Sequence, residues 1–213
     1  PNDKIVTLKI PVLLGGHPLL GNSEALQELA KEFGTYTMET TLDVFNGCTT
    51  WLLMGVQADE NVRNALQRLA FQAVAAAEAG SQCLMLDDTT VQSGAAGWLD
   101  PMLALSAVDE ALRARAKQKR SNLRRRVGVV VRSAAIRNLH DIVLLSGFGA
   151  DAVNPYAMYA AAMQQMEKKK DHSPIDLQRS LLYSLKAGLE KVISTMGCHE
   201  LRGYGRVCSS IGL

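Results

Sequence analysis

The sequence has few cysteines, little net charge, no long hydrophobic run and no complete catalytic motif, and each shortage excludes a class of protein. Its four cysteines, Cys48, Cys83, Cys198 and Cys208, form no Cys-x-x-Cys pair, so a paired metal or redox motif is excluded. No uninterrupted apolar run reaches the roughly 18 residues that a membrane helix needs. The net charge of +2 is too small to indicate nucleic acid by itself. We therefore expect neither a membrane nor a nucleic-acid partner.

The isolated thiols favour a reducing compartment, which predicts a cytoplasmic protein. Cys83 lies within an apolar run, where a buried, reduced thiol is the favoured interpretation. The polar residues 1–4 do not resemble a signal peptide. Because the first residue is not Met, we expect a chain that was processed or cut from something larger. Whether the natural protein ends at Leu213 stays open.

What is present is an ordinary globular composition. The chain has 213 residues, of which 47% are hydrophobic and 21% charged. This length allows one sizeable hydrophobic core. We therefore predict that residues 1–213 form a single domain.

Hydrophobic periodicity and helix-capping residues predict alternating strands and helices. Residues 1–16 are interrupted by Pro11 and are expected to be extended at a sheet edge, and residues 49–55 give no clear pattern. Strands are expected at 35–45, 82–86, 127–131 and 150–153, and the main helices at 24–33, 60–79 (capped by Asp59), 101–119, 138–147, 156–168 and 176–196. This order predicts an α/β fold, a partial or degenerate (β/α) barrel-like parallel sheet with an extra C-terminal helix.

Asp87 and Asp88 are the leading candidate site residues. They follow a predicted strand, and α/β proteins bind ligands at the carboxyl ends of their strands. Paired acids can hold a divalent cation or act as a general base. The favoured alternative is that one carboxylate caps the following loop while the other is solvated. We predict no catalytic, cofactor or metal residue beyond these two candidates.

The other polar motifs are weaker. The four histidines show no metal-ligand spacing, and the glycine-rich stretches match neither a Walker loop nor a dinucleotide fingerprint. Cys198 and His199 adjoin in sequence, which rarely gives a nucleophile–base pair. A basic run lies at Lys117, Lys119, Arg120 and 124–126. It can bind phosphate or nucleic acid, but a solvated loop is favoured because no aromatic residues are interleaved with it.

Several segments together resemble the central domain of the large subunit of glutamate synthase. The most specific match is residues 144–156, where a helix ends on glycines and a short strand runs into Asn-Pro-Tyr. Residues 84–88 resemble the family segment Val-Leu-Ser-Asp-Arg, which also carries an aspartate after a strand. Further similar segments lie at residues 10–13, 41–45, 186–197 and 211–213. The sequence departs from the family at Thr195, where a lysine is missing, and within residues 203–210.

The resemblance implies a role in an enzyme that converts glutamine and 2-oxoglutarate into two glutamates. In that family a glutamine amidotransferase domain precedes the central domain, and a barrel carrying FMN and an iron–sulfur cluster follows it. The resemblance therefore implies a non-catalytic connecting domain, with those two domains as partners and no cofactor of its own. The alternative is a stand-alone α/β enzyme or ligand-binding protein that uses Asp87 and Asp88.

Overall fold

The computed structural model of the chain describes residues 4–16, 23–119, 122–166 and 173–198. Four strands form one sheet: β1 (Thr49–Leu53), β2 (Cys83–Asp87), β3 (Gly128–Arg132) and β4 (Ala152–Asn154). The helices in these ranges are α1 (Glu24–Phe33), α2 (Met38–Val44), α3 (Val62–Glu78), α4 (Thr89–Gln92), α5 (Pro101–Lys119), α6 (Leu123–Arg126), α7 (Leu139–Phe148), α8 (Tyr156–Met166) and α9 (Pro174–Thr195). None of them is long and apolar enough to cross a bilayer.

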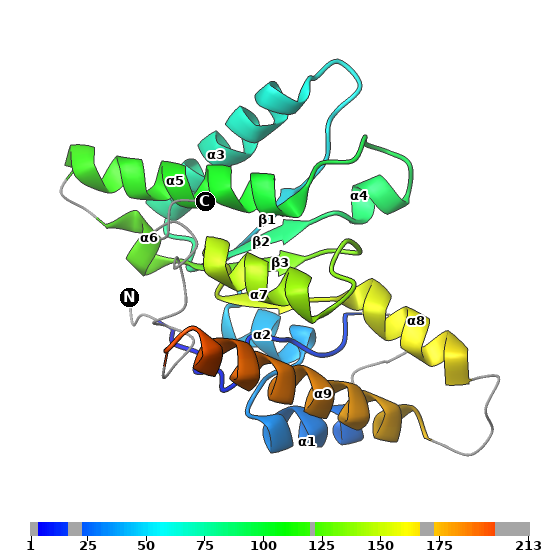
Figure 1. Ribbon diagram of the computed structural model, residues 1–213. Helices are drawn as coiled ribbons and strands as arrows, with labels where there is room; N and C mark the ends of the chain where they lie inside the picture. The colour runs from blue at the N-terminus through cyan, green and yellow to red at the C-terminus, as the bar shows by residue number, and fades with distance from the viewer. Residues whose placement is uncertain (1–3, 17–22, 120–121, 167–172, 199–213) are drawn as a thin grey trace.

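The sheet is parallel, and its spatial order is β1-β2-β3-β4. Each strand therefore lies beside the strand that precedes it in sequence, which is how a (β/α) barrel winds. The register pairs Cys83 with Thr49 on one side and with Gly128 on the other. Figure 1 shows α3, α5 and α7 following the successive strands. The predicted α/β, partial barrel-like parallel sheet is confirmed, and α9 is its extra C-terminal helix.

The two faces of the sheet bury different sets of side chains, because successive residues of a strand point to opposite faces. Leu84, Leu86 and Val131 belong to the larger core, which includes residues of α3, α5 and α7. Cys83 and Met85 point the other way. That second face is covered by Leu13, Met38 and Phe45, which come from the N-terminal segment, α2 and the residue after it. The apolar run at 127–131 is thus covered on both faces, as predicted.

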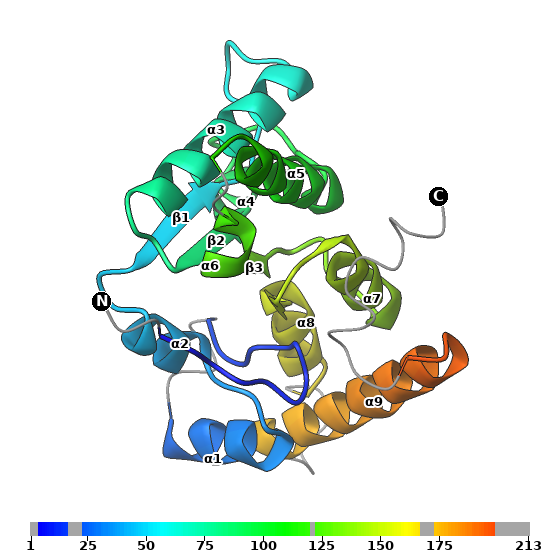
Figure 2. The ribbon, with the colours of Figure 1, turned by 90° about the vertical axis from the view of Figure 1, so that its left-hand side faces the viewer.

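The two edges of the sheet differ. At β4 the amide of Val153 donates to the Pro11 carbonyl (2.7 Å), and the Leu13 amide donates to the Val153 carbonyl (2.8 Å). The N-terminal segment is therefore extended at an edge, as its proline predicted. At the opposite edge, β1 has no further strand beside it among the described residues. Figure 2 shows the N-terminal segment, α1 and α2 on the side of the sheet away from α3 and α5.

The prediction of a strand at 35–45 is wrong, because most of this segment forms α2. The hydroxyl of Thr37 caps the helix by accepting the Thr40 amide (3.0 Å). The hydroxyl of Thr41 donates to the Thr37 carbonyl (2.8 Å), which satisfies it inside the helix. A segment rich in threonine and valine favours a strand only where its side chains can pack against those of neighbouring strands. The first strand is instead β1, in the segment that gave no clear pattern.

Several predicted helix starts are confirmed, and two are wrong by two residues. The last helix was expected from 176, but α9 begins at Pro174 with Ser173 as its cap. Ser23 and Asn138 cap α1 and α7, as expected. The expected cap at Asp59 is wrong, because Asn61 accepts the Asn64 amide (2.9 Å) and α3 begins at Val62. Both residue types are good caps, so local sequence did not distinguish them.

Candidate functional site

The carboxyl ends of β2, β3 and β4 bring five polar side chains together: Asp87, Asp88, Arg132, Ser133 and Asn154. Asp87 pairs in register with Arg132, and Arg132 with Asn154. Asp88 and Ser133 directly follow the paired residues. Together with Tyr156 of α8, these residues are called the strand-end network below. The predicted candidates Asp87 and Asp88 therefore do lie at the edge where parallel α/β folds commonly bind ligands.

Asp87 is a buried ion-paired carboxylate, with 2% of its surface exposed. Arg132 Nη1 lies 2.5 Å from Asp87 Oδ1. The other oxygen, Oδ2, accepts the Thr89 amide (3.3 Å) and a short bond from the Thr89 hydroxyl. Asp87 therefore holds the start of α4, which confirms that one of the two acids caps the following segment.

The Arg132 guanidinium makes three different contacts with the rest of the chain. Besides its ion pair with Asp87, its Nη2 donates to the Gly16 carbonyl (2.8 Å). Its carbon Cζ lies 4.5 Å from the centre of the Tyr156 ring, a cation–π contact. A guanidinium at a strand end is a typical phosphate or carboxylate ligand. Here these three contacts hold it within the protein.

Asp88 is also buried, with 4% of its surface exposed, so the interpretation of a solvated second carboxylate is wrong. Its oxygens accept the Ser133 hydroxyl (2.6 Å), the Ala134 amide (2.9 Å) and the Tyr156 hydroxyl (2.7 Å). Burial, together with the hydrogen bond to Asp88, raises the pKa of Tyr156. Tyr156 therefore stays a neutral donor to this carboxylate.

Asn154 connects the network to the N-terminal segment. Its Nδ2 donates to the carbonyls of Leu13 (3.0 Å) and Gly15 (3.1 Å), and the Tyr159 hydroxyl donates to the same Leu13 carbonyl (3.0 Å). Gly15 has a φ of 73°, which a residue with a side chain rarely adopts. The turn at Gly15 thus brings the chain back over the strand ends.

This arrangement favours a structural role for the strand-end network over a catalytic one. Each carboxylate has several donors, and no group of three or more potential metal ligands (His, Cys, Asp, Glu) occurs in the described part of the chain. A cation at Asp87 or Asp88 would have to displace Arg132 or Tyr156. Buried networks in which the carboxylates are hydrogen-bonded in this way rigidify a fold.

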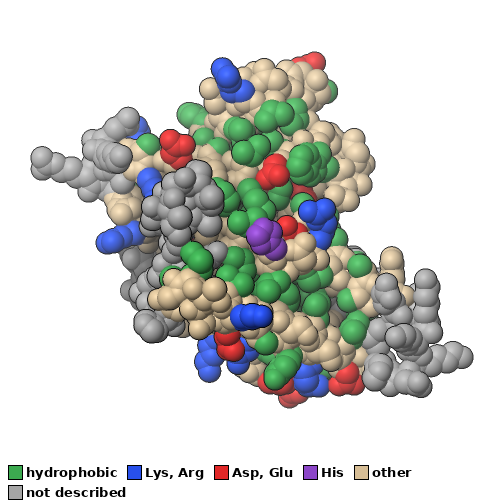
Figure 3. Space-filling model, in the orientation of Figure 1, with side chains coloured by type: hydrophobic (Ala, Val, Ile, Leu, Met, Phe, Trp, Pro, Cys, Tyr) green, Lys and Arg blue, Asp and Glu red, His purple; other side chains and the backbone are tan. Residues whose placement is uncertain are grey.

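The basic run is divided between a buried residue and exposed ones. Arg124 is buried and binds Asp109 (2.6 Å), Asp151 (2.9 Å) and the carbonyl of Gly149 (2.6 Å). The expectation of a solvated run is therefore wrong for Arg124, although 125 and 126 are exposed. Arg120 lies outside the described residues, as do the side chains of 117 and 119. On the face shown in Figure 3, basic side chains are interspersed with acidic and uncharged ones.

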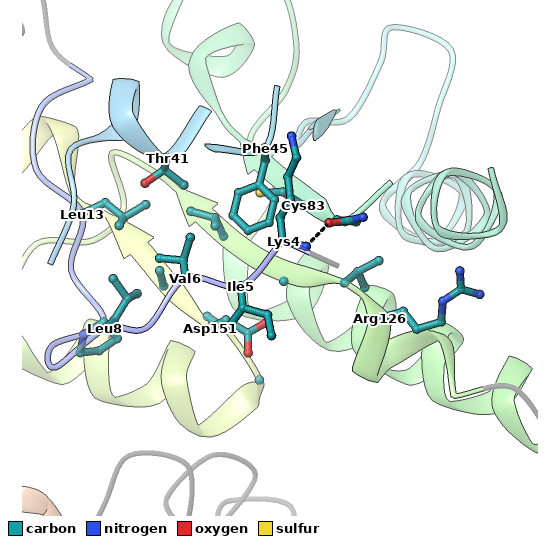
Figure 4. Close-up of a pocket in the computed structure, with 18 of the residues that line it drawn as sticks. Lys4, Ile5, Val6, Leu8, Leu13, Thr41, Phe45, Cys83, Arg126 and Asp151 are labelled. Carbon is teal, nitrogen blue, oxygen red and sulfur yellow. Dashed lines mark hydrogen bonds between the residues drawn. The ribbon is translucent and has the colours of Figure 1, made fainter. Parts of the chain in front are cut away.

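A cavity of about 640 Å³ lies at the opposite, amino end of the sheet. The segment with Val6 and Leu8 forms one wall, and Figure 4 shows this segment crossing in front of the sheet near Cys83. Burial raises the pKa of Cys83 to about 11, so the thiol is protonated at neutral pH and a poor nucleophile. The interpretation of Cys83 as a buried, reduced thiol is confirmed.

Sequence reasoning missed the basic and phenolic members of the network. Arg132 ends an apolar strand and belongs to no recognisable motif, and Tyr156 lies in the segment 144–156 that gave the family resemblance but no role in a site. The signal that could have found Arg132 is its position at the end of a strand, because polar residues that end adjacent parallel strands meet at one edge of the sheet. His140, the only histidine in the described ranges, is exposed on α7 and lies outside this network.

The fold and network define a class: a parallel α/β domain whose strand ends are closed by its own side chains. The sequence comparisons give the particular family. The model of the glutamate synthase central domain matches residues 2–213, and the chain belongs to this family. The predicted resemblance is confirmed.

Curated relatives are glutamate synthases. The large chain of the NADPH enzyme of Bacillus subtilis is 29% identical over 72% of this chain and 10% of that protein. The NADH enzyme of Schizosaccharomyces pombe is 31% identical over 66% of this chain and 6% of its own length. The chain thus spans about a tenth or less of these relatives. A mandelate oxidase structure gives a TM-score of 0.43 at 16% identity, covering 96% of this chain and 82% of the oxidase.

Proposed function

We propose that this chain is the non-catalytic connecting domain of a glutamate synthase, placed between a glutamine amidotransferase domain and an FMN barrel. One observation carries the proposal: the edge where α/β enzymes bind ligands is filled by the chain's own Arg132, Tyr156 and Asn154. Membership of the central-domain family supports the same role. Residues 1–213 would act as one structural unit in the larger enzyme.

The same observation favours a domain without its own cofactor. A flavin phosphate needs free donors, but the Arg132 guanidinium is bonded to Asp87 and Gly16. FMN and the iron–sulfur cluster would belong to the neighbouring barrel. The cysteines Cys48, Cys83 and Cys198 are free and far apart in sequence, a pattern that does not favour a cluster site.

The alternative is a stand-alone enzyme or ligand-binding protein that uses Asp87 and Asp88. General acid–base work requires a carboxylate within reach of a substrate. Asp87 and Asp88 are 2% and 4% exposed. Both oxygens of each carboxylate accept hydrogen bonds from other groups of the chain. This alternative is therefore less favoured.

The two roles of Asp87 are separated by its amide variant. In the complete enzyme, Asp87→Asn breaks the ion pair and leaves the partly buried Arg132 cation without its carboxylate, which costs up to roughly 3–5 kcal/mol of stability. At a temperature where the variant is folded, we expect kcat for glutamine-dependent glutamate synthesis to change less than about threefold. Steady-state kinetics and thermal unfolding measure the two effects.

The matched control is Asp43→Asn, because Asp43 is an exposed acid on α2. We expect it to change neither stability nor activity. A kcat loss of about 100-fold or more in Asp87→Asn, with an unchanged melting temperature, would contradict the proposal and support the stand-alone enzyme. Purification of the 213-residue chain with bound flavin would contradict it as well.

A further inference from the structure

The two edges of the sheet are protected unequally. At β4, residues 11–13 pair with the strand and close its edge. Among the described residues no segment does this for β1. Proteins commonly protect an edge strand with lysine, proline or a bulge. The sequence of β1, Thr-Thr-Trp-Leu-Leu, has neither lysine nor proline.

The backbone of β1 is open on its outer side. The Cys48 carbonyl and the Met54 amide both bond to residues of the β2 segment. Because alternate residues of a parallel strand point their backbone groups to opposite sides, those of Thr49, Trp51 and Leu53 point away from β2. Of these groups, the Leu53 carbonyl accepts a long bond from Arg68 (3.5 Å). The outward amides of Trp51 and Leu53 have no partner among the described residues.

The same two residues also present apolar side chains to solvent. Leu52 packs into the core beside α3, so Trp51 and Leu53 point to the other face of the sheet. On β2 and β3 that face is covered by Leu13 and Phe45. At β1 the cover ends, and Trp51 and Leu53 are 44% and 48% exposed. Unpaired amides and exposed apolar side chains therefore lie together on one strand.

We propose that β1 is a docking edge for an extended segment from another part of the glutamate synthase polypeptide, which would add a strand beside β1. This inference rests on the proposed function. Only an extended segment satisfies a row of strand amides and carbonyls, and apolar residues at its alternate positions would cover Trp51 and Leu53. The source is supported by length, because the match to the Bacillus subtilis relative covers 10% of that protein.

The test is amide hydrogen exchange in the complete enzyme and in the chain alone. The amides of Trp51 and Leu53 should exchange roughly 100-fold or more slowly in the complete enzyme, because a hydrogen-bonded amide exchanges only when the pair opens. Leu53→Lys places a charge under the docked segment and should remove this protection. Leu103→Lys is the matched control, since Leu103 on α5 is 51% exposed and should leave the protection intact.

The alternatives give different outcomes. Free exchange of β1 in the complete enzyme, with other segments of the domain protected, would overturn the docking edge and leave the proposed function standing. No difference anywhere between the complete enzyme and the chain alone would overturn both. Protection of β1 in the chain alone, together with a dimer by light scattering that Leu53→Lys dissolves, would identify a second copy as the occupant and overturn the proposal.

Discussion

At the residue scale, Arg124 makes buried contacts to several elements, and no sequence motif predicted these contacts. Its guanidinium joins Asp109 of α5 to Gly149 and Asp151, which lie between α7 and β4, and also donates to the Val127 carbonyl (2.9 Å). Burial alone would lower the pKa of Arg124, but the charges of Asp151 and Asp109 outweigh it, so the pKa is raised. The residue therefore stays charged inside the protein.

Arg124→Met should destabilise the fold by about 3–5 kcal/mol, because it leaves buried carbonyls and the Asp109 carboxylate without this partner. Arg125→Met is the control. Arg125 is the exposed neighbour on α6, and its loss should change stability by no more than about 0.5 kcal/mol. Urea unfolding followed by circular dichroism measures both variants. Equal unfolding midpoints for the two would show that the Arg124 contacts contribute no net stability.

The candidate site was predictable in part at this scale. Asp87 and Asp88 were found because they end a strand. Their burial was not predictable, since it depends on Arg132 and Tyr156, which lie 45 and 68 residues beyond their partners Asp87 and Asp88. Single-sequence reasoning assigns a carboxylate to solvent unless a partner is visible. Here the partners come from β3 and α8.

At the scale of elements, two glycines that follow helices allow the cost of backbone conformation to be separated from that of packing. Gly80 follows α3 with φ 103°, and Gly149 follows α7 with φ 114°. A Cβ at Gly80 would meet nothing within 4 Å. A Cβ at Gly149 would lie 2.9 Å from Asp109 Oδ1 and disturb its pair with Arg124.

Gly80→Ala should therefore cost about 1–2 kcal/mol, the penalty for a side chain in left-handed backbone. Gly149→Ala should cost at least about 1 kcal/mol more, because it adds a steric conflict beside a buried ion pair. The difference between the two free energies of unfolding, from denaturant curves, is the measured quantity. A difference near zero would mean that α5 moves freely away from the end of α7.

The elements themselves were predicted well where a glycine or a capping residue marks a boundary, as at Ser23, Asn138 and Gly149. The exception was α2. Its residues favour a strand by composition, but Thr37 caps a helix, and Met38 packs under the sheet. A short helix that is stabilised mainly by tertiary packing leaves a weak local signal. β1 escaped prediction because its exposed Trp51 and Leu53 break the usual alternation.

At the scale of the whole molecule, α9 determines how the parts are joined. It packs against α1, α7 and α8, so the last described helix contacts the first one. In Figure 2 α1 and α9 lie at the bottom of the molecule, and α3 and α5 lie at the top. One core cluster includes residues from both regions, such as Leu26 of α1, Leu69 of α3 and Leu185 of α9. This continuity favours a single folding unit.

A single unit should unfold in one cooperative transition. The two tryptophans, Trp51 and Trp98, lie in β1 and just before α5. Their fluorescence therefore reports on the part of the domain that contains β1 and α5. Far-ultraviolet circular dichroism reports on all helices, including α1 and α9. The two thermal melting curves should coincide. Separate midpoints would divide residues 1–213 into two units.

The pairing of residues 11–13 with β4 also has a consequence for synthesis on the ribosome. Leu13 and its partner Asn154 are 141 residues apart, so this early apolar segment leaves the exit tunnel long before its binding strand is translated. Closing so long a loop is also slow. The nascent chain must therefore carry residues 11–13 without their partner strand until most of the sequence has been made, a period in which a chaperone has an obvious target.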